Sequence, residues 1–280
     1  MNRFVKLSCL ALSAAMTMAT GAPPTATAPA TQPASAPAPK PITLKLPDGV
    51  EMKLVLIPPG KFMMGSTPSG GRSEKDERPQ REVTITRPFY LGVTEVTQRQ
   101  YQAVMGANPS QVKAPDNPVD AVSWDEANEF CRKLSAATGR KARIPTEAEW
   151  EYACRAGTTT LWTFGSDVKD LDAYAWHSGN AGGASHPVAG KKPNPWGLYD
   201  MYGNVCEWCF DYHGSYAKVP KVDPTGPAEG NHRILRGGSW ANPPEFCRSP
   251  NRAGAGPESK RKNLGLRVVV EPVEPPKPAP

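Results

Sequence analysis

The chain has 280 residues, of which 32 are proline, 33 are Lys or Arg and 27 are Asp or Glu, for a formal net charge of +6 at neutral pH. This composition excludes collagen, a coiled coil and a polytopic membrane protein. The charge does not imply a nucleic-acid partner, because removal of the basic N-terminus described next leaves a net charge of only +4, from 31 basic and 27 acidic residues.

Residues 1–22 are predicted to be a secretory signal peptide. Arg3 and Lys6 precede an uncharged stretch over residues 7–21 that ends in small residues. The stretch is shorter than the roughly 20 residues that span a bilayer, so a retained anchor is the minor alternative. Cys9 precedes the apolar run instead of closing it, which disfavours a lipoprotein signal. We therefore expect an exported protein of the periplasm, the cell envelope or the extracellular space, with no transmembrane segment after signal removal.

Proline marks both ends of the remaining chain. Seven prolines fall in residues 22–41 and five in residues 272–280. Such segments contain too little apolar bulk to offset the entropy of an ordered chain. The predicted organisation is therefore a disordered Pro/Ala-rich linker at 23–41, one domain at 42–270 and a Pro-rich tail at 271–280. A domain of this length buries roughly 70 to 75% of its unfolded surface, so its core does not depend on disulfides.

Short strands are predicted in the first part of this domain. Residues 52–57 are typical of a strand, which the following Pro58-Pro59-Gly60 ends. Residues 65–81 contain no apolar period and are expected to form a long exposed loop. Alternating residues 83–85 and an apolar run at 89–93 predict a second pair of strands.

Three helices are predicted, each from a capping residue at its start and a glycine at its end. The two main ones begin with a capping box, in which Ser or Thr is followed three residues later by Glu. The predicted helices run from Thr97 to Met105, from Ser123 to Gly139 with Ala127, Phe130, Cys131 and Leu134 on the apolar face, and from Thr146 to Gly157 with Trp150, Ala153 and Cys154 inward.

Residues 158–262 contain little sustained periodicity and many Gly, Pro, Asn and Trp residues. Only brief strands are predicted, around residues 233–235 and 264–270. The region is nevertheless expected to be ordered, because five tryptophans demand burial. The sequence therefore predicts a loop-rich α+β fold, a type that often carries its functional residues on loops. The tryptophans are at positions 162, 176, 196, 208 and 240.

The basic excess of the chain is regional. Between Arg233 and Arg267 there are eight basic and two acidic residues. This segment is either a solvated face, which is the more common case, or a surface that favours an anionic ligand.

Five cysteines remain after signal removal, so at least one thiol is unpaired within the chain. Cys206 and Cys209 form a C-x-x-C motif, but the chain lacks the thioredoxin-like βαβ unit of a redox couple and the second C-x-x-C of a zinc ribbon. Cys131 and Cys154 are expected to be small buried residues of the two main helices. The four histidines, at 177, 186, 213 and 232, lack metal-binding spacing and are expected to lie in turns or at the surface. Fingerprints of common hydrolases, kinases and dehydrogenases are also absent.

Seven strings, taken in order, resemble one family. They are IPPGKFMMGS (57–66), FYLGVTEVTQRQYQ (89–102), NPVDAVSWDEANEFC (117–131), RIPTEAEWEYACRAG (143–157), NPWGLYDMYGNVCEW (194–208), RILRGGSW (233–240) and NLGLRV (263–268). Over about residues 50–270 the chain resembles the formylglycine-generating enzyme / sulfatase-modifying factor family. The resemblance implies that family's variant of the C-type-lectin-like fold, which is α+β and loop-rich with two main helices and short strands.

The resemblance also implies an oxidoreductase site. Active members oxidise a sulfatase cysteine to formylglycine with molecular oxygen and copper(I). Two cysteine thiolates after a GGS(Y/W) string bind the copper and leave room for the substrate thiol. Here that stretch reads GGSWANPPEFCRSPNR, with Cys247 as its only cysteine and Asn242 at the position of the first thiolate. Ser239 matches a serine of the active pocket. Because the cysteine pair is missing, the copper mechanism loses its metal site.

A calcium site is implied by the string from Asp200 to Glu207. In the family a calcium ion is held along this string by two side chains and two backbone carbonyls. Carried over residue by residue, Asp200 and Glu207 would supply side-chain oxygens, and Gly203 and Val205 would supply carbonyls. Oxygen donors of this kind suit calcium.

A disulfide between Cys209 and Cys247 is a further implication of the resemblance. Related chains with the EWC string tend to carry a cysteine in the CRS string as well. Cys206 stands where the family usually has an aromatic residue, so it is expected to fill core space.

Two functions are therefore weighed. The first is an exported, calcium-stabilised and non-oxidising binding or scaffold module, whose groove holds an extended peptide or a glycan of the cell envelope with Trp240, Asn242 and Arg252 at its rim. Trp240 is equally consistent with a position in the core. The alternative is a formylglycine-generating oxidoreductase that uses copper with Cys247 and Ser239, or a related oxidative enzyme like the relatives that use iron.

Overall fold

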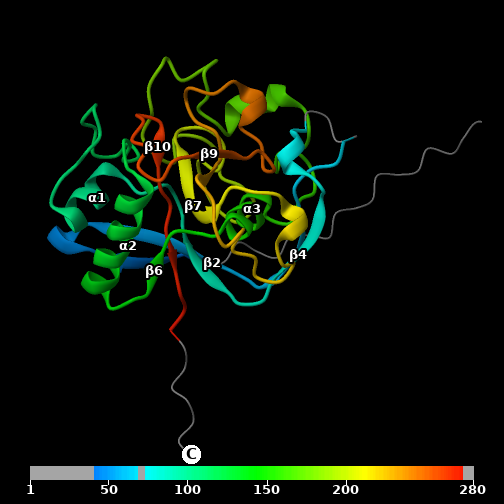
Figure 1. Ribbon diagram of the computed structural model, residues 1–280. Helices are drawn as coiled ribbons and strands as arrows, with labels where there is room; N and C mark the ends of the chain where they lie inside the picture. The colour runs from blue at the N-terminus through cyan, green and yellow to red at the C-terminus, as the bar shows by residue number, and fades with distance from the viewer. Residues whose placement is uncertain (1–40, 69–72, 274–280) are drawn as a thin grey trace, which may run out of the picture. The chain divides into compact units, whose positions relative to one another are not determined.

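The computed structural model of the chain describes residues 41–68 and 73–273 (Figure 1). The predicted signal peptide, all of the linker except its last residue and most of the tail lie outside these residues. No helix within the described part is both long and apolar enough to cross a membrane.

A five-stranded antiparallel sheet contains the first predicted strands. Residues 52–57 and 89–93, which were predicted as strands, form the neighbours β2 and β5, with Leu56 opposite Tyr90. The order is β1 (Ile42–Lys45), β2 (Glu51–Ile57), β5 (Phe89–Gly92), β11 (Val269–Val270) and β6 (Ala142–Arg143). Both ends of the domain therefore contribute strands to this sheet.

Helices α1 (Gln98–Met105) and α2 (Trp124–Thr138) lie side by side next to this sheet (Figure 1). Helix α2 begins with the predicted capping box. Helix α1 also has one, in which Gln100 occupies the position of the usual glutamate. Both end at a glycine with positive φ, a backbone conformation that glycine adopts without steric cost. The rings of Tyr101 and Phe130 stack 5.3 Å apart between the two helices.

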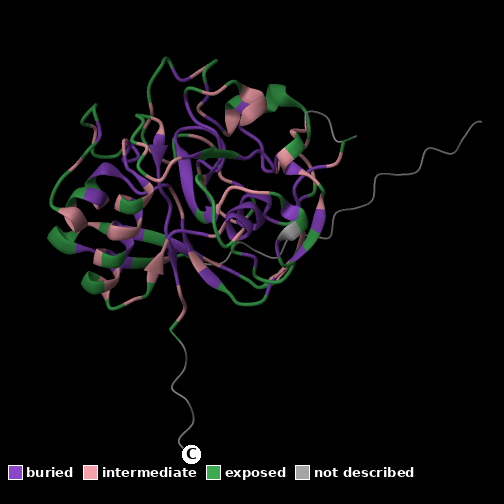
Figure 2. Ribbon diagram, viewed as in Figure 1, coloured by how far each residue is buried: buried purple, intermediate pink, exposed green. Residues whose placement is uncertain are grey.

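Helix α3 (Glu147–Arg155) is buried on every side, as Figure 2 shows. It contacts the hairpin of β3 (Gly60–Met64) and β4 (Arg81–Ile85) as well as the second sheet described next. The sequence predicted the helix and its Thr146 capping box but only one inward face. The helix ends at Arg155, and Ala156, one residue before the predicted glycine, adopts the positive φ that follows it.

The second sheet has the order β10 (Leu264–Gly265), β7 (Cys206–Tyr212), β8 (Arg233–Arg236) and β9 (Ala253–Ala255), with only β10 and β7 parallel. The predicted strand at 233–235 is β8. The predicted strand at 264–270 is instead divided between the two sheets as β10 and β11. Strand β7 was not predicted, because residues 206–209 are all buried and show no alternation of apolar and polar side chains.

The prediction that residues 65–81 form a long exposed loop is wrong in part. Its described residues include a buried Ser66 and the 3-10 helix η2 (Lys75–Glu77), in which Glu77 is fully buried. The cause is a distant partner, because the Glu77 carboxylate accepts hydrogen bonds from Arg248, 171 residues away. The other 3-10 helices of the described residues are η1 (Pro47–Gly49), η3 (Val168–Ala173), η4 (Tyr216–Lys218) and η5 (Pro244–Phe246).

Two large apolar clusters form the core. One surrounds α3 and the β3–β4 hairpin, and the other lies between α1, α2 and the five-stranded sheet. The predicted burial of tryptophan is confirmed at positions 162, 208 and 240, whereas Trp176 and Trp196 are only partly buried.

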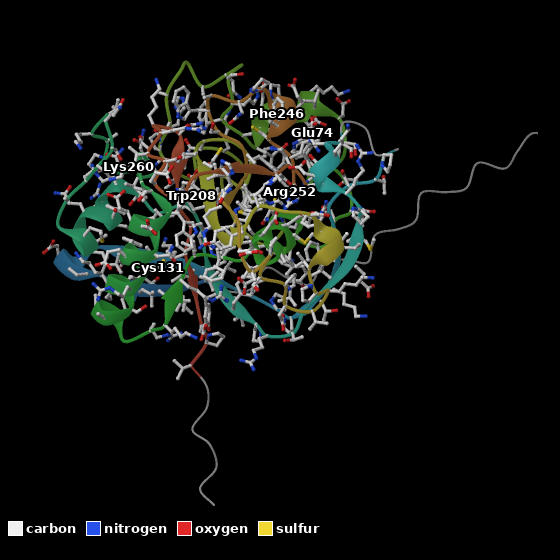
Figure 3. All side chains as sticks on the ribbon, in the orientation of Figure 1. Glu74, Cys131, Trp208, Phe246, Arg252 and Lys260 are labelled. Atoms are coloured by element: carbon white, nitrogen blue, oxygen red, sulfur yellow. The ribbon has the colours of Figure 1, made fainter. Side chains whose placement is uncertain are left out.

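Four arginines of the basic region at 233–267 are buried in ion pairs. Because their carboxylate partners come from other parts of the chain, most of the local charge excess is neutralised inside the domain. The pairs are Arg236 with Glu151, Arg248 with Glu77, Arg252 with Glu147 and Arg267 with Glu207. The exposed cations are Lys260, Arg261 and Lys262, and Figure 3 shows Lys260 toward the outside of the molecule and Arg252 among packed side chains.

Candidate functional site

The stretch after β8 forms a loop that folds back on the second sheet. Gly237 and Gly238 have φ values of 88° and 73°, which glycine tolerates best. A Cβ atom on Gly238 would lie 2.8 Å from the Cys247 sulfur. The two glycines therefore allow the loop to bring Ser239 and Asn242 close to Cys247.

Ser239 and Asn242 are joined by hydrogen bonds within this loop. The Ser239 hydroxyl donates to Asn242 Oδ1 at 2.6 Å and accepts from Asn263 Nδ2 at 3.0 Å. Ser239 is completely buried, and Asn242 is half-buried. The serine therefore has its hydrogen bonds satisfied by the protein itself.

One thiol lies beside Asn242, and Cys247 follows in the same loop. Cys206 on β7 has its sulfur 3.8 Å from Asn242 Oδ1. Burial raises the pKa of Cys206 to about 12, and burial also raises the pKa of the Cys247 thiol far above its usual range. Because the thiolate is the form that binds metals, this environment opposes the copper chemistry of the active relatives.

The expected disulfide between Cys209 and Cys247 is not formed. All five described cysteines are free thiols and buried. Cys209 and Cys247 belong to the apolar cluster around α3, where each fills core space. Cys206 belongs to the other large cluster, so the two sulfurs of the C-x-x-C motif serve different parts of the core. The expected burial of Cys131 and Cys154 is confirmed.

Of the two other candidate ligand contacts, Asn242 is half-buried, whereas Trp240 is a buried core residue. Trp240 is 8% exposed and packs with Ala181, Val205 and Trp176. Its indole N–H donates to the carbonyl of Lys262 at 3.3 Å, and the Lys262 ammonium lies 4.9 Å from the ring centre. The indole is therefore covered by its neighbours, and the cation of the exposed Lys262 lies over it.

Arg252 is not at the rim of a groove, contrary to expectation. It is only 6% exposed, and its Nε and Nη2 donate to the Glu147 carboxylate at 2.6 and 2.8 Å. Its Nη1 donates to the carbonyls of Asp76 and Gly214. A guanidinium satisfied in this way stabilises the core and has no nitrogen left for a ligand.

Asp200, the first residue of the candidate calcium string, carries an unsatisfied carboxylate oxygen. Asp200 is 2% exposed, and its Oδ2 accepts a hydrogen bond from the Ala189 amide at 2.7 Å. Its Oδ1 is buried without a hydrogen-bond partner. Burial raises the pKa of Asp200 to about 6, and the nearby Glu207 adds to this rise. A buried oxygen in this state fits a cation.

Glu207, at the other end of the string, already has partners. Its carboxylate accepts from the Trp150 indole N–H at 2.7 Å and from Arg267 Nη2 at 2.7 Å and Nε at 2.9 Å. Sequence reasoning identified neither partner, because Trp150 and Arg267 are about 60 residues away in either direction. A cation at Glu207 would share the carboxylate with Arg267.

Gly203, expected to offer its carbonyl, has a packing reason to be glycine. It has a φ of 76°, and a Cβ atom there would lie 2.0 Å from the carbonyl oxygen of Trp176. Its backbone crosses that of Trp176, so the identity of this residue is explained without a metal.

Glu95 is a carboxylate of this site that the sequence did not reveal. It is fully buried, and its pKa is raised well above the usual range by burial and by the charges of Asp200 and Glu207. Of these carboxylates, Glu207 pairs directly with the Arg267 guanidinium. Across the described residues, no three His, Cys, Asp or Glu side chains converge as a metal centre. Calcium here would thus depend on backbone carbonyls, as the resemblance implies.

The histidines do not form a site. His177 Nε2 lies 2.7 Å from Asp172 Oδ1, and His213 Nε2 lies 3.0 Å from Asp76 Oδ2. His186 stacks on Trp176 with ring centres 3.8 Å apart. Each ring is therefore held by its own separate contacts.

Comparison with known proteins shows to which family the chain belongs. Residues 45–272 match the sulfatase-modifying factor enzyme 1-like domain. The chaperone protein LppX of Paenibacillus barcinonensis is 30% identical, with 77% of this chain and 88% of that protein covered. The formylglycine-generating enzyme of Streptomyces coelicolor is 28% identical, with the same coverage of 77% and 88%.

A solved structure agrees with these matches. The variable protein 1 of Treponema denticola superimposes with a TM-score of 0.76 at 30% identity, covering 84% of this chain and all of that one. The fold is accordingly the formylglycine-generating-enzyme variant of the C-type-lectin-like fold. The chain belongs to the family of sulfatase-modifying factor enzyme 1-like domains.

Proposed function

We propose that this protein is an exported, non-oxidising binding module that calcium stabilises. The observation that carries the proposal is the Asn242 environment. At the position of the first copper thiolate, an amide oxygen accepts a 2.6 Å hydrogen bond from Ser239, and burial keeps the remaining thiol, Cys247, protonated. Both features oppose copper-dependent oxidation of a substrate cysteine, and neither disturbs the fold.

The ligand that fits the loop is an extended peptide or a glycan of the cell envelope. Asn242 offers a half-buried amide on this loop, and Lys262 offers an exposed cation over the buried Trp240 ring. The name of the LppX relative, a chaperone protein, is consistent with a role in binding. Export is supported by the sequence features of residues 1–22.

Calcium would be held by the side-chain oxygens of Asp200 and Glu207 and by the carbonyls of Gly203 and Val205. When bound, the ion supplies positive charge to carboxylates that outnumber their single arginine partner, Arg267. Its role is structural.

An activity assay tests the non-oxidising proposal. The full chain, loaded with calcium, is incubated with copper(I), oxygen and a peptide containing the C-x-P-x-R sequence, and the peptide mass is measured. We expect no aldehyde. The formylglycine-generating enzyme of Streptomyces coelicolor serves as the positive control. Aldehyde formation that Cys247→Ser abolishes would overturn the proposal.

One observation favours the oxidative alternative enough to test it directly. Cys206 on β7 places a sulfur 3.8 Å from Asn242 Oδ1, at the position of the first copper thiolate. If the protein oxidises the peptide with this pair of thiols, Cys206→Ser and Cys247→Ser must each abolish turnover, whereas Cys131→Ser must not.

A further inference from the structure

A groove of about 650 Å³ lies between the start of β5, the start of α3 and the end of the described chain after β11. Its apolar lining includes the buried side chains of Ile85 and Phe89 and the exposed ring of Phe210 on β7. Among the described residues that line it, none belongs to the Trp240 loop or to the candidate calcium string. The groove is therefore separate from both sites.

Exposed apolar side chains gather at this groove. Phe210 and Val273, two of the large apolar residues that the described part of the chain exposes, line it. A third, Val222, directly precedes the lining residue Asp223. A cluster of exposed apolar side chains is unfavourable in water and usually marks a place where another segment binds.

The walls of the groove are held in place by contacts within the domain. The Asp223 carboxylate accepts a hydrogen bond from the Thr86 amide at 2.8 Å, and the Asp223 amide donates to the Thr84 carbonyl at 2.9 Å, which fixes this loop to β4. The Glu271 carboxylate lies 2.8 Å from the Lys141 ammonium, which fixes the end of the described chain next to β6. Because the groove is preformed, a segment that binds there orders only itself.

The C-terminal tail begins at this groove. Pro272 and Val273, the last residues that the structure describes, line it. The chain continues over residues 274–280 as EPPKPAP, in which four residues are proline. Proline-rich segments favour the extended polyproline II conformation, which rises about 3.1 Å per residue, so this tail can span roughly 22 Å. Segments of this kind bind grooves that are lined by apolar and aromatic side chains.

The charges of the tail and of the groove are complementary. The tail carries one cation, Lys277, and one anion, Glu274. The groove offers the exposed carboxylate of Asp223 and the exposed guanidinium of Arg87. Exposed ion pairs contribute little free energy, so the apolar contacts supply most of the affinity and the charges set the direction of the tail.

The position of the groove favours the tail over the Pro/Ala-rich linker as its occupant. The linker joins the domain at β1, which is one edge of the five-stranded sheet. The groove lies at β5, β11 and β6, toward the other edge of that sheet.

We propose that the C-terminal tail, residues 274–280, docks in this groove of its own chain and covers Phe210. Proline rings of the tail pack on the Phe210 ring, and Lys277 pairs with Asp223. Because the tail is tethered at Val273, its effective concentration at the groove is high, so a weak contact is enough to keep the groove occupied. The docking depends neither on calcium nor on the ligand of the Trp240 loop.

Zero-length cross-linking of the full chain tests the docking. A carbodiimide joins an amine to a carboxylate where the two groups are in contact, and mass spectrometry of the digested protein identifies the joined residues. We expect Lys277 to be joined to Asp223. The exposed pair of Lys61 and Glu82, 3.0 Å apart, is the internal reference for the yield.

Two variants and a matched control show whether apolar contact holds the tail. Phe210→Ser removes the exposed ring, and the double substitution Pro275→Gly and Pro276→Gly removes the stiff apolar part of the tail. Each should lower the yield of the tail cross-link about fivefold or more relative to the reference pair. Val168→Ser changes an exposed apolar residue that does not line the groove, so the yield should stay the same. The tail variant leaves the domain unchanged and decides the question even if Phe210→Ser does not fold.

Four results would overturn the proposal. If the reference pair is joined but the tail is not, the groove is open. Equal yields in every variant would show that the tail meets Asp223 only because it is tethered nearby. A cross-link of Asp223 to Lys40 in place of Lys277 would identify the linker as the occupant. In a mixture of isotope-labelled and unlabelled protein, tail cross-links that combine both isotopes would show that the tail of a second copy fills the groove.

Discussion

The buried arginines have a different role from the one that their basic sequence region suggests. Arg236, Arg248, Arg252 and Arg267 look like a basic surface in the sequence, but each is 6% exposed or less and hydrogen-bonded to a glutamate. Breaking a buried ion pair leaves a charge without a partner, which costs far more than losing an exposed pair. The arginines therefore belong to the stability of the domain and not to its recognition of anionic ligands.

Arg236→Ala tests the value of these pairs. Arg236 contacts Glu151 and donates to the Ser249 carbonyl at 2.9 Å, so its removal leaves Glu151 Oε2 and this carbonyl without their donor while Arg155 still pairs with Glu151 Oε1. We expect a loss of about 3 to 5 kcal/mol in the free energy of unfolding, measured in urea. Lys61→Ala is the control, because Lys61 and Glu82 form an exposed pair, and should cost less than about 1 kcal/mol. Equal losses would contradict this account.

At the level of elements, local signals were reliable for helices and poor for strands. The capping boxes at Ser123 and Thr146 and the cap at Thr97 all form where the sequence predicted them, because capping depends on residues only three apart. Strand β7 was missed, since burial on both faces erases the alternation by which strands are recognised.

Ser123→Ala tests the cap of α2. The Ser123 hydroxyl accepts from the Glu126 amide at 3.2 Å, and the Glu126 carboxylate accepts from the Ser123 amide at 3.0 Å. Loss of the hydroxyl leaves an amide of the first turn unsatisfied and should lower the free energy of unfolding by about 1 kcal/mol. Ser123→Gly should cost only a few tenths of that amount. An Ala variant as stable as the Gly variant would show that the cap contributes little.

At the scale of the whole molecule, folding brings buried charged side chains to the place where the second sheet meets the loops. Glu95 follows β5, Asp200 precedes β7, Glu207 lies on β7 and Arg267 lies between β10 and β11. Folding therefore collects these groups from four parts of the chain.

Calcium should raise the melting temperature of the full chain, and a chelator should reverse the effect. At 100 times its dissociation constant the ion adds about 2.7 kcal/mol, or roughly 5 to 10 °C for a domain of this size. Asp200→Asn removes one charge but keeps an acceptor for the Ala189 amide, so it should retain the fold and lose most of the calcium response. An unchanged response in calorimetric scans would remove Asp200 from the site.

The candidate site was predictable only in part. The strings around Ser239, Asn242 and Cys247 located the loop, and Asp200 and Glu207 located the acidic region. Glu95 could not be found in this way, because its neighbours are set by contacts 109 and 110 residues away. The exposure assigned to Arg252 was wrong for the same reason, since its partner Glu147 lies 105 residues earlier.

By itself, the sequence determined the family, the helix starts and the missing cysteine pair, because each depends on residue identity or on neighbours within one turn. Only the tertiary structure decided which arginines face inward, that the five described thiols are unpaired, and which carboxylates meet. Burial and charge pairing depend on segments far apart in the chain, and only the folded chain brings them together.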